Sequence, residues 1–332
     1  PLRISRTQYT EAQMTKPDGR DGEVAVLGLG RSGAAVTKLL LADGKRVYAS
    51  DAGNAIAVSD TARQLGDLGA AVDVGDHDLE RIAAASMVVV SPGIDPAAPA
   101  VKAARDAAKP LVSEIEVALG YLGGTKIIAV TGTNGKTTTT SLVGHILRGL
   151  GENAVDAGNI GAPLSDFARR DNRPDWIALE MSSFQLHDTP GLRPDVGVLT
   201  NLSPDHLDRY PTEDEYYADK RRLFANATKS SKWVFNTDDS RVTDAVSEVP
   251  GTKLGFSLRE QADAWLDDAS GTLNLFGSKL ISRAELNLLG DHNVANALAA
   301  SLAVAAADGR FAEPDARRQI AAASAVTLGR DS

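Results

Sequence analysis

The sequence contains no cysteine and no long uninterrupted run of apolar residues. Without cysteine the chain forms no disulfide, holds no metal through thiolates and has no cysteine nucleophile, which fits a cytoplasmic protein. No apolar stretch approaches the roughly 20 residues that span a bilayer. Residues 1–20 are polar and of mixed charge, unlike a signal peptide. We therefore expect a cytoplasmic protein that does not associate with a membrane.

An excess of positive charge is also missing. The sequence has 35 Lys and Arg residues and 44 Asp and Glu residues, which gives a formal net charge of −9. Proteins that bind nucleic acid nonspecifically contact its phosphates through Lys and Arg, so we expect no nucleic-acid partner. If the ligands are anions, local groups must attract them: backbone N–H groups, helix N-termini, a few cations or a metal.

The first third of the chain alternates short apolar runs with amphipathic stretches. EVAVLGLG predicts a buried strand, RSGAAVTKLLLADG a helix that ends at a glycine, and RVYASD the next strand. This β-α-β-α succession predicts an α/β fold with a mostly parallel sheet and helices on both faces. We predict an N-terminal extension at residues 1–20 and a first domain at 21–118.

A second α/β succession follows the glycine-bearing connection LGYLGG. KIIAVTG, WIALEMSS and DVGVLTNLS predict strands, and KTTTTSLVGHILRGLG and the Ala-rich NVANALAASLAVAAADG predict helices. Weakly patterned runs between Thr252 and Leu289 predict a small antiparallel sheet. At 332 residues the chain is long enough for two cores, and we predict the second domain at 119–328.

GLGRSG, from Gly28 to Gly33, follows a predicted strand and opens a helix. Glycine in such a turn permits positive φ and lets backbone N–H groups approach a diphosphate. Asp51 ends the next strand, where its carboxylate is placed to accept hydrogen bonds from a ribose. The turn predicts a nucleotide or sugar-nucleotide site. A nicotinamide dinucleotide and a nucleoside-diphosphate sugar both satisfy it, and a purely structural turn is the alternative.

TGTNGKTTTT resembles a nucleotide-phosphate loop, although Val130 stands where the usual first glycine belongs. Gly132 and Gly135 can supply the unusual dihedrals that aim N–H groups at phosphate oxygens. Lys136 would place its charge on the terminal phosphates, and the Thr137 hydroxyl would bind Mg²⁺. Four successive threonines are poor helix formers, which a ligand explains better than packing does. The alternative is an ordinary glycine-containing turn.

Two further residues are expected at the same edge of the sheet. Glu180 ends the strand WIALE, and His206 follows the strand VGVLTNL. Because ligands of parallel sheets lie beyond the carboxyl ends of the strands, Thr137, Glu180 and His206 predict an Mg²⁺ or Mn²⁺ site beside phosphates. Taken singly, Glu180 would be a helix cap and His206 a surface histidine.

Other polar residues leave their role open. Lys220 lies in EDEYYADKRRLFANA, whose i, i+4 charge pairs are typical of a solvated helix face, so we interpret it as structural. Asn293 and Asn296 share one face of a helix and would either read an adenine edge or cap that helix. No metal-ligand spacing is shown by the remaining histidines, which are His77, His145, His187 and His292.

The motifs GTNGKTT, GNIG, ALEMSSFQL, SPDHLDRYP and DHNVANALAA, in this order, resemble the Mur ligases of peptidoglycan synthesis. The likeness covers residues 22–328, and GLGRSG, together with ALEMSSFQL and DHLDRY, resembles the branch that acts on UDP-MurNAc-L-alanine. It implies a Rossmann-like N-terminal domain followed by a P-loop-type α/β ATPase domain with a small accessory β-sheet. Folylpolyglutamate synthases share the loop type, so the combination of motifs carries the likeness rather than any single one.

The resemblance implies a role for each residue type. Lys136, Glu180, His206 and Lys220 would be catalytic, with Lys220 carbamylated into a metal ligand beside Thr137, Glu180 and His206. ATP would be bound by Gly132, Thr133, Asn134, Gly135, Lys136, Thr137, Thr138, Asn293 and Asn296. UDP-MurNAc-L-alanine would be bound by Gly30, Arg31, Ser32, Gly33, Asp51, Asn159 and Ser182.

The implied reaction is ATP-dependent amide ligation through an acyl phosphate, with ATP, Mg²⁺ (or Mn²⁺), UDP-MurNAc-L-alanine and D-glutamate as small-molecule partners of a monomer. The family has a third, C-terminal domain, and this chain ends at LGRDS, where that domain should start. We therefore expect weak ligand binding without ligase activity. The alternatives are a noncatalytic UDP-sugar/ATP-binding fragment and an NAD-dependent oxidoreductase, which would leave TGTNGKTT unexplained.

Overall fold

The computed structural model describes residues 22–205, 210–286 and 290–325. They form two compact units that are interleaved along the chain. Unit 1 holds residues 22–123 together with two later segments, Pro163–Arg173 and Asp188–Gly191, and unit 2 holds the rest. Neither unit is one continuous stretch of the sequence. The expected domain ranges 1–20, 21–118 and 119–328 stay predictions.

Unit 1 is built on a five-stranded, wholly parallel sheet with the strand order β3-β2-β1-β4-β5. Its elements are β1 (Glu23–Leu27), α1 (Arg31–Ala42), β2 (Arg46–Asp51), α2 (Ile56–Asp67), β3 (Ala71–Val74), α3 (Leu79–Ala84), β4 (Met87–Val90), α4 (Pro99–Asp106), β5 (Leu111–Val112), α5 (Glu114–Leu119) and α7 (Leu164–Ala168). The predicted parallel α/β sheet is confirmed.

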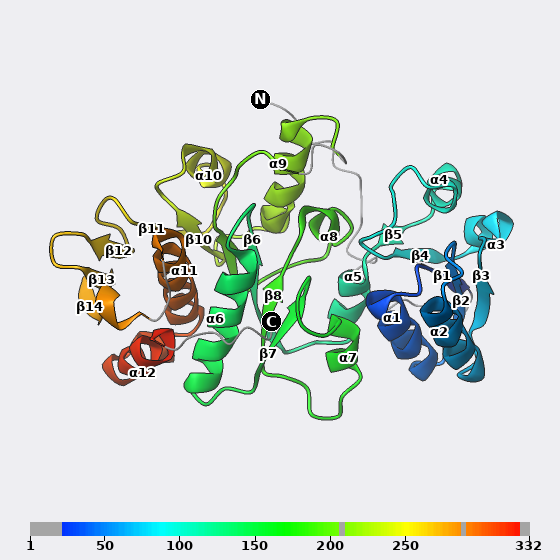
Figure 1. The fold of residues 1–332 in the computed structure, drawn as a ribbon, viewed down its shortest axis with the longest axis horizontal. Coiled ribbons are helices and arrows are strands. Elements are labelled where there is room, and N and C mark those ends of the chain that lie inside the picture. The colour runs from blue at the N-terminus through cyan, green and yellow to red at the C-terminus, as the bar shows by residue number, and fades with distance from the viewer. Residues whose placement is uncertain (1–21, 206–209, 287–289, 326–332) are drawn as a thin grey trace. The chain divides into compact units, whose positions relative to one another are not determined.

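The strands β1, β2 and β4 of unit 1 are largely buried on both faces, as apolar runs in a parallel sheet require, whereas the edge strand β3 is partly exposed. On one face Ala25 and Leu27 of β1 pack with residues of α3 and α4. The helices α1 and α2 lie side by side, and α1 also contacts α5 and α7 (Figure 1). The strand order reverses between β1 and β4, which is where open α/β sheets bind ligands.

Unit 2 contains a nine-stranded sheet with the order β14-β13-β12-β11-β10-β9-β6-β8-β7. Its strands are β6 (Lys126–Thr131), β7 (Ala154–Gly158), β8 (Trp176–Glu180), β9 (Val196–Leu199), β10 (Lys232–Asn236), β11 (Thr252–Ser257), β12 (Ala264–Asp267), β13 (Thr272–Leu275) and β14 (Ser278–Ser282). Its α-helices are α6 (Lys136–Gly149), α8 (Ser183–His187), α9 (Glu213–Arg221), α10 (Ser240–Val246), α11 (Asp291–Ala307) and α12 (Pro314–Ser324). Short 3₁₀ turns are η2 (Arg222–Phe224), η3 (Arg283–Glu285) and η4 (Gly309–Ala312).

The core of unit 2 lies between its sheet and the helices α6 and α11, which run side by side (Figure 1). The Ala-rich sequence of α11 suits this place, since small side chains let a helix be buried on several sides at once. β6 lies inside the sheet between β8 and β9, and its residues after Lys126 are all buried. The loop that follows β6 is therefore held at the middle of the carboxyl edge.

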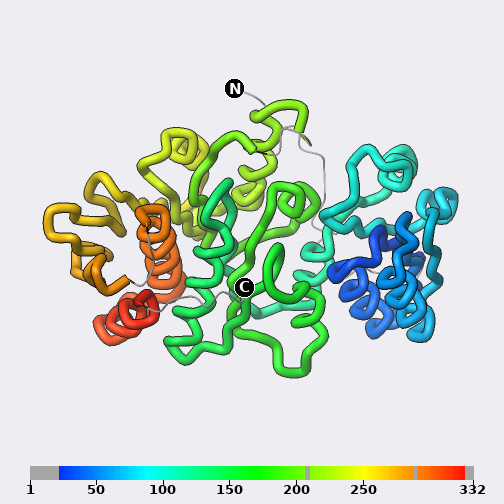
Figure 2. The backbone as a smooth tube through the Cα atoms, viewed as in Figure 1, coloured from blue at the N-terminus to red at the C-terminus, as the bar shows by residue number. Residues whose placement is uncertain are grey.

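The small accessory sheet expected near 252–289 is not separate. β12, β13 and β14 pair antiparallel as expected, and Figure 2 traces the chain doubling back through them. However, β11 pairs in parallel with both β10 and β12, which joins these strands to the main sheet. This pairing with β11 satisfies backbone groups that an isolated sheet would leave at an open edge.

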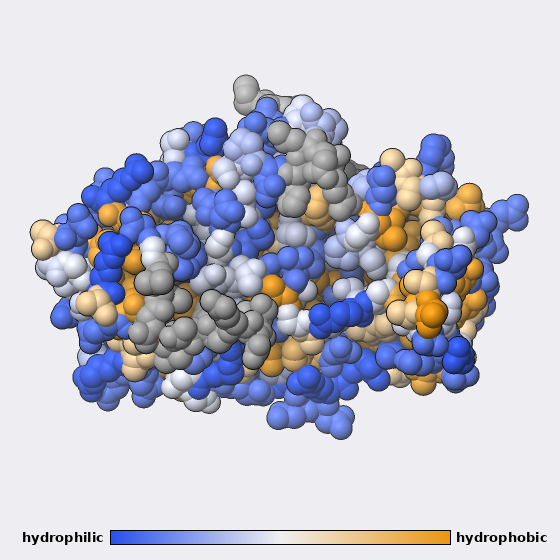
Figure 3. Space-filling view, viewed as in Figure 1, coloured by the Kyte–Doolittle hydropathy of each residue, from blue (hydrophilic) through white to orange (hydrophobic). Residues whose placement is uncertain are grey.

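Buried apolar residues form the cores of the two units. None of the helices among the described residues is both long and apolar enough to cross a bilayer. In Figure 3 hydrophilic residues cover most of the visible face, with smaller hydrophobic areas between them.

Candidate functional site

The loop between β6 and α6 has the backbone that phosphate binding needs. Gly132 and Gly135 have φ of +145° and +80°, which favour glycine over other residues. A Cβ at Gly135 would lie 2.3 Å from the Asn296 Oδ1 atom, so the position also excludes a side chain sterically. Gly135 is the N-cap of α6 and supplies no capping side chain. The N–H groups of the first turn are thus left for another acceptor, such as a phosphate.

Two residues that sequence reasoning missed hold this loop in shape. Thr200 and Asn201 follow β9, the strand next to β6. The N–H of Asn134 donates to the Asn201 Oδ1 atom at 2.9 Å, and the Thr200 hydroxyl donates to the Asn134 carbonyl at 2.7 Å. The N–H of Thr133 donates to the Asn201 carbonyl at 2.9 Å. Their place beyond the carboxyl end of a parallel strand was the available signal.

The two lysines predicted for the site meet at one carbonyl. Lys136 Nζ donates to the Gly132 carbonyl at 3.1 Å and to the Thr133 carbonyl at 2.8 Å. Lys220 Nζ donates to the same Gly132 carbonyl at 2.7 Å. The structure therefore brings Lys136 and Lys220 together although they lie far apart in the sequence.

Lys220 corrects the residue-level interpretation of its helix. Its side chain is 1% exposed instead of lying on a solvated face, and its amine lies 4.5 Å from the centre of the Tyr216 ring. Burial, reinforced by the charge of Lys136, lowers the pKa of Lys220 to about 7, against the opposing charges of Asp205 and Asp219. Burial likewise lowers the pKa of Lys136, which the charges of Glu180 and Asp205 partly offset.

Asp219 fastens the helix that carries Lys220. Its carboxylate is hydrogen-bonded to the His187 ring nitrogen at 2.8 Å, to Arg222 Nε at 2.8 Å and to the Tyr210 hydroxyl at 3.0 Å. Burial works to raise the pKa of Asp219, but the hydrogen bonds and charges of His187 and Arg222 outweigh it and hold the pKa below its usual range. His187, which shows no metal spacing in the sequence, thus ties α8 to α9.

Glu180 lies buried at the end of β8, 1% exposed. Its Oε1 atom accepts from the Asn159 amide at 2.8 Å, whereas Oε2 has no hydrogen-bond partner among the described residues. Glu180 does not cap the following helix, because the Ser182 hydroxyl accepts from the Gln185 N–H at 3.2 Å. A buried carboxylate oxygen without a donor suits a cation, and the structure brings Asn159 and Glu180 together.

The oxygen atoms offered by these side chains fit a magnesium ion that is also bound by the phosphate oxygens of a substrate. Among the residues that the structure describes, no cluster of three or more His, Asp or Glu side chains could enclose a metal. Mg²⁺ usually takes one or two carboxylates and completes its shell with phosphate oxygens and water. Glu180 and the exposed Thr137 at the start of α6 match that pattern. His206 lies outside the described residues.

Asn296 lies against the phosphate loop. It is 6% exposed, and its Oδ1 atom accepts from the Thr139 hydroxyl at 3.2 Å. Its amide donates to Asn293 Oδ1 at 3.3 Å. Gly290, with no side-chain cap, is the N-cap of α11, so the alternative in which the two asparagines cap that helix is wrong.

The GLGRSG turn of unit 1 is shaped by close backbone approach. Gly28 has φ of +90°, and a Cβ at Gly33 would lie 1.8 Å from the Gly28 carbonyl oxygen. α1 then begins at Arg31 after the N-cap Gly30, without a side-chain cap. No atom lies within 4 Å of a Cβ placed at Gly30, so space is open beside the turn.

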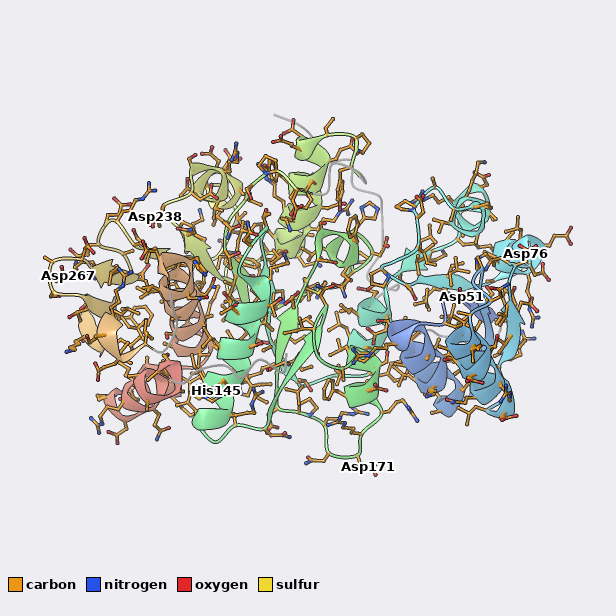
Figure 4. All side chains as sticks on the ribbon, in the orientation of Figure 1. Asp51, Asp76, His145, Asp171, Asp238 and Asp267 are labelled. Atoms are coloured by element: carbon orange, nitrogen blue, oxygen red, sulfur yellow. The ribbon has the colours of Figure 1, made fainter. Side chains whose placement is uncertain are left out.

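Asp51 binds this turn to the next strand. It ends β2, where it is labelled in Figure 4. Its Oδ2 atom accepts from the Leu29 N–H at 2.7 Å, and its Oδ1 atom accepts from the Gly53 N–H at 2.8 Å. Each carboxylate oxygen keeps a second lone pair for a ligand hydroxyl. A cavity of about 440 Å³ adjoins the turn and is lined by Gly30 and Arg31.

Both loops lie in segments that match known protein families. Residues 130–304 match the Mur ligase middle domain, and residues 22–113 match the Mur ligase MurD-like N-terminal domain. UDP-N-acetylmuramoylalanine–D-glutamate ligase of Syntrophotalea carbinolica is 39% identical over 83% of this chain and 62% of that protein. The enzyme of the same name from Desulfatibacillum aliphaticivorans is 34% identical over 85% of this chain and 64% of its own length. The chain thus spans just under two thirds of these relatives.

Solved structures share the fold. UDP-N-acetylmuramate:L-alanyl-gamma-D-glutamyl-meso-diaminopimelate ligase from Neisseria meningitides superposes with a TM-score of 0.63 at 19% identity, covering 94% of this chain and 99% of that one. A murein peptide ligase from Psychrobacter arcticus gives a TM-score of 0.61 at 20% identity, covering 93% and 68%. The match of the middle domain to more than half of the residues shows that the chain belongs to the Mur ligase family.

Proposed function

We propose that the chain binds ATP and UDP-MurNAc-L-alanine for the ATP-dependent reaction that joins the substrate carboxylate to D-glutamate. The observation that carries this proposal is the arrangement at the β6–α6 loop. There an uncapped helix N-terminus, Lys136 and the buried Glu180 surround a place suited to phosphates and a cation. The names of the relatives supply the substrate class.

The chemistry begins with transfer of a phosphoryl group. A carboxylate oxygen of UDP-MurNAc-L-alanine bonds to the γ-phosphorus of ATP, ADP leaves, and an acyl phosphate results. The D-glutamate amine, having lost a proton, then attacks the acyl carbon, and inorganic phosphate leaves with the C–O bond electrons. Two anions must meet in the first step, so catalysis rests on positioning and charge neutralisation. Lys136 and the α6 N-terminus provide these for the phosphates.

Glu180, Thr137 and His206 would hold magnesium, which when bound neutralises phosphate charge. Lys220 would join them as a carbamate. The lowered pKa of about 7 supports that role, because only a neutral amine reacts with CO₂. Thr133, Asn134, Thr138, Asn293 and Asn296 would complete the ATP site, and Asn159 and Ser182 would contact the substrate.

The UDP group would be bound in unit 1. There the turn from Gly30 to Gly33 offers uncapped N–H groups, and Asp51 offers acceptors for ribose hydroxyls. We expect these substrates to be made and used in the cytoplasm, and we propose that location for this protein and a monomeric state.

Replacing Lys136 with alanine tests the ATP site. We expect K136A to weaken Mg·ATP binding at least about tenfold in isothermal titration, since it removes the point charge on the terminal phosphates. The matched control is Lys232→Ala, because Lys232 also donates its amine to carbonyls, those of Ala306 and Ala307, away from the loop. Normal ATP binding by K136A would contradict the loop assignment.

Ligand choice tests the substrate assignment. Titration of the chain with UDP-MurNAc-L-alanine should show binding, and NADH fluorescence should not be quenched. Phosphate release is then measured with ATP, UDP-MurNAc-L-alanine and D-glutamate, and robust D-glutamate-dependent turnover would contradict the expectation that this chain alone lacks ligase activity. Binding of NADH in preference to the UDP ligand would reject the ligase proposal in favour of an oxidoreductase.

A further inference from the structure

Charged side chains line the cavity beside the GLGRSG turn, and some of them lie outside the turn. Its cationic wall is formed by Arg31 and Lys38 of α1, and Asp166 of α7 lies on another part of the wall. The remaining lining is mostly apolar or small and consists of Leu29, Gly30, Ala34, Ala35, Ala57, Val58, Thr61 and Pro163. A protein with a net charge of −9 thus places two cations and one acid around this space.

Lys38 belongs to the same helix face as Arg31. The two positions lie close to two turns of an α-helix apart, and Ala34 and Ala35 line the cavity between them. Side chains of an α-helix lean toward its N-terminus, so a lysine at this position covers the turn before it rather than the turn after it. The Lys38 stem therefore leads back along the cavity toward the GLGRSG end.

Lys38 is partly buried, and within the described part of the chain it makes no hydrogen bond and no ion pair. Lys102 of α4, by contrast, pairs with Asp106 one turn away. An anion that enters the cavity can pair with the Lys38 ammonium group, which no described residue engages, so the site favours an anionic ligand over a neutral one.

We propose that Lys38 is a further ligand-binding residue of this protein, which pairs with the diphosphate of the sugar nucleotide. The proposal rests on the assignment of the UDP group to unit 1 and extends it to a residue beyond the glycine turn. Lys38 contributes charge and not base recognition, so it discriminates diphosphates from monophosphates and nucleosides.

The test is a ligand series on matched variants. Wild type, Lys38→Ala, Lys38→Glu and the control Lys45→Ala are titrated with UDP, UMP, uridine and NADH by calorimetry, after thermal melts confirm that each is folded. Lys45 follows α1 and does not line the cavity. We expect K38A to weaken UDP binding roughly fivefold and K38E by more, with uridine affinity unchanged and K45A like wild type. The salt dependence of UDP affinity should also become shallower in K38A.

Each alternative result of these titrations contradicts a specific part of the proposal. If K38A and K45A bind UDP equally, or if K38A weakens uridine as much as UDP, Lys38 does not read the diphosphate. If wild type binds NADH tightly and UDP poorly, and K38A loses the NADH affinity, Lys38 reads a diphosphate but the sugar-nucleotide assignment fails. Wild type that binds neither ligand overturns both proposals.

Discussion

At the scale of single residues, buried charge is where this protein departs most from its sequence pattern. Lys220 lies in a run of charged residues that is typical of a solvated helix, yet the structure buries it beside Tyr216 and Gly132. Helical periodicity reports which positions share a face, but it does not report which tertiary neighbour covers that face. The family resemblance alone pointed to Lys220.

Glu114 is a second buried charged group, and it has a measurable consequence. It is 4% exposed, and its carboxylate accepts from the Ser165 N–H at 2.5 Å. Burial raises the pKa of Glu114 from 4.5 to about 7, although the hydrogen bonds from Ser165 oppose that shift. The folded protein therefore holds this proton more tightly than the unfolded chain. The stability gained is fully present below about pH 4.5 and is lost as pH rises through about 7.

Replacing Glu114 with glutamine should remove that pH dependence. Glutamine stays neutral and keeps an oxygen acceptor for Ser165, so E114Q should be more stable than wild type at pH 8, by up to about 3 kcal/mol, and similar at pH 5. Urea unfolding at both pH values measures this. The control Glu80→Gln changes an exposed residue of α3 and should leave the profile unaltered. Parallel profiles for E114Q and wild type would contradict the prediction.

At the scale of elements, strands and helices with strong periodicity were predictable. The run KIIAVT and the Ala-rich α11 stand out because an apolar stretch in an α/β fold is buried wherever it lies. The joining of β12–β14 to the main sheet was not predictable, since the edge that a short strand pairs with depends on the whole topology. Thr200 and Asn201 follow a predicted strand, but their contacts with the phosphate loop depend on β9 lying next to β6, which the sequence pattern does not report.

The pairing of β9 with β10 leaves no room at Gly197. A Cβ there would lie 2.5 Å from a carbon of the Trp233 ring, which is buried and stacks edge-on with Phe224. We expect Gly197→Ala to destabilise the protein by roughly 1–3 kcal/mol through overpacking.

The control for this substitution is the same change in open space. Gly66 lies within α2, and a Cβ added to it would meet no atom within 4 Å, so Gly66→Ala should stabilise by roughly 0.5–1 kcal/mol through helix propensity. Denaturant unfolding of both variants provides the measurement. Changes of the same sign in the two variants would refute the packing argument.

At the scale of the whole molecule, each unit has its own sheet and its own candidate nucleotide loop. We expect UDP to slow amide hydrogen exchange at the turn around 28–34 in unit 1, and Mg·ATP to slow it at 131–140 in unit 2. Exchange followed by mass spectrometry distinguishes the two, because a bound ligand protects the amides it contacts. If both nucleotides protected the same loop, the assignment of two ligands to two loops would fail.

The interleaving of the units limits how the gene can be divided. The path passes from one unit to the other at 123/124, 162/163, 173/174, 187/188 and 191/192. A single cleavage at any of these points leaves at least one of the two fragments without segments that belong to its unit. A protein made of residues 22–123 alone would lack the Ser165 partner of Glu114. Split-gene or single-protease experiments will therefore yield unfinished halves, and a self-contained first unit requires Pro163–Arg173 and Asp188–Gly191 to be grafted onto it by new connections.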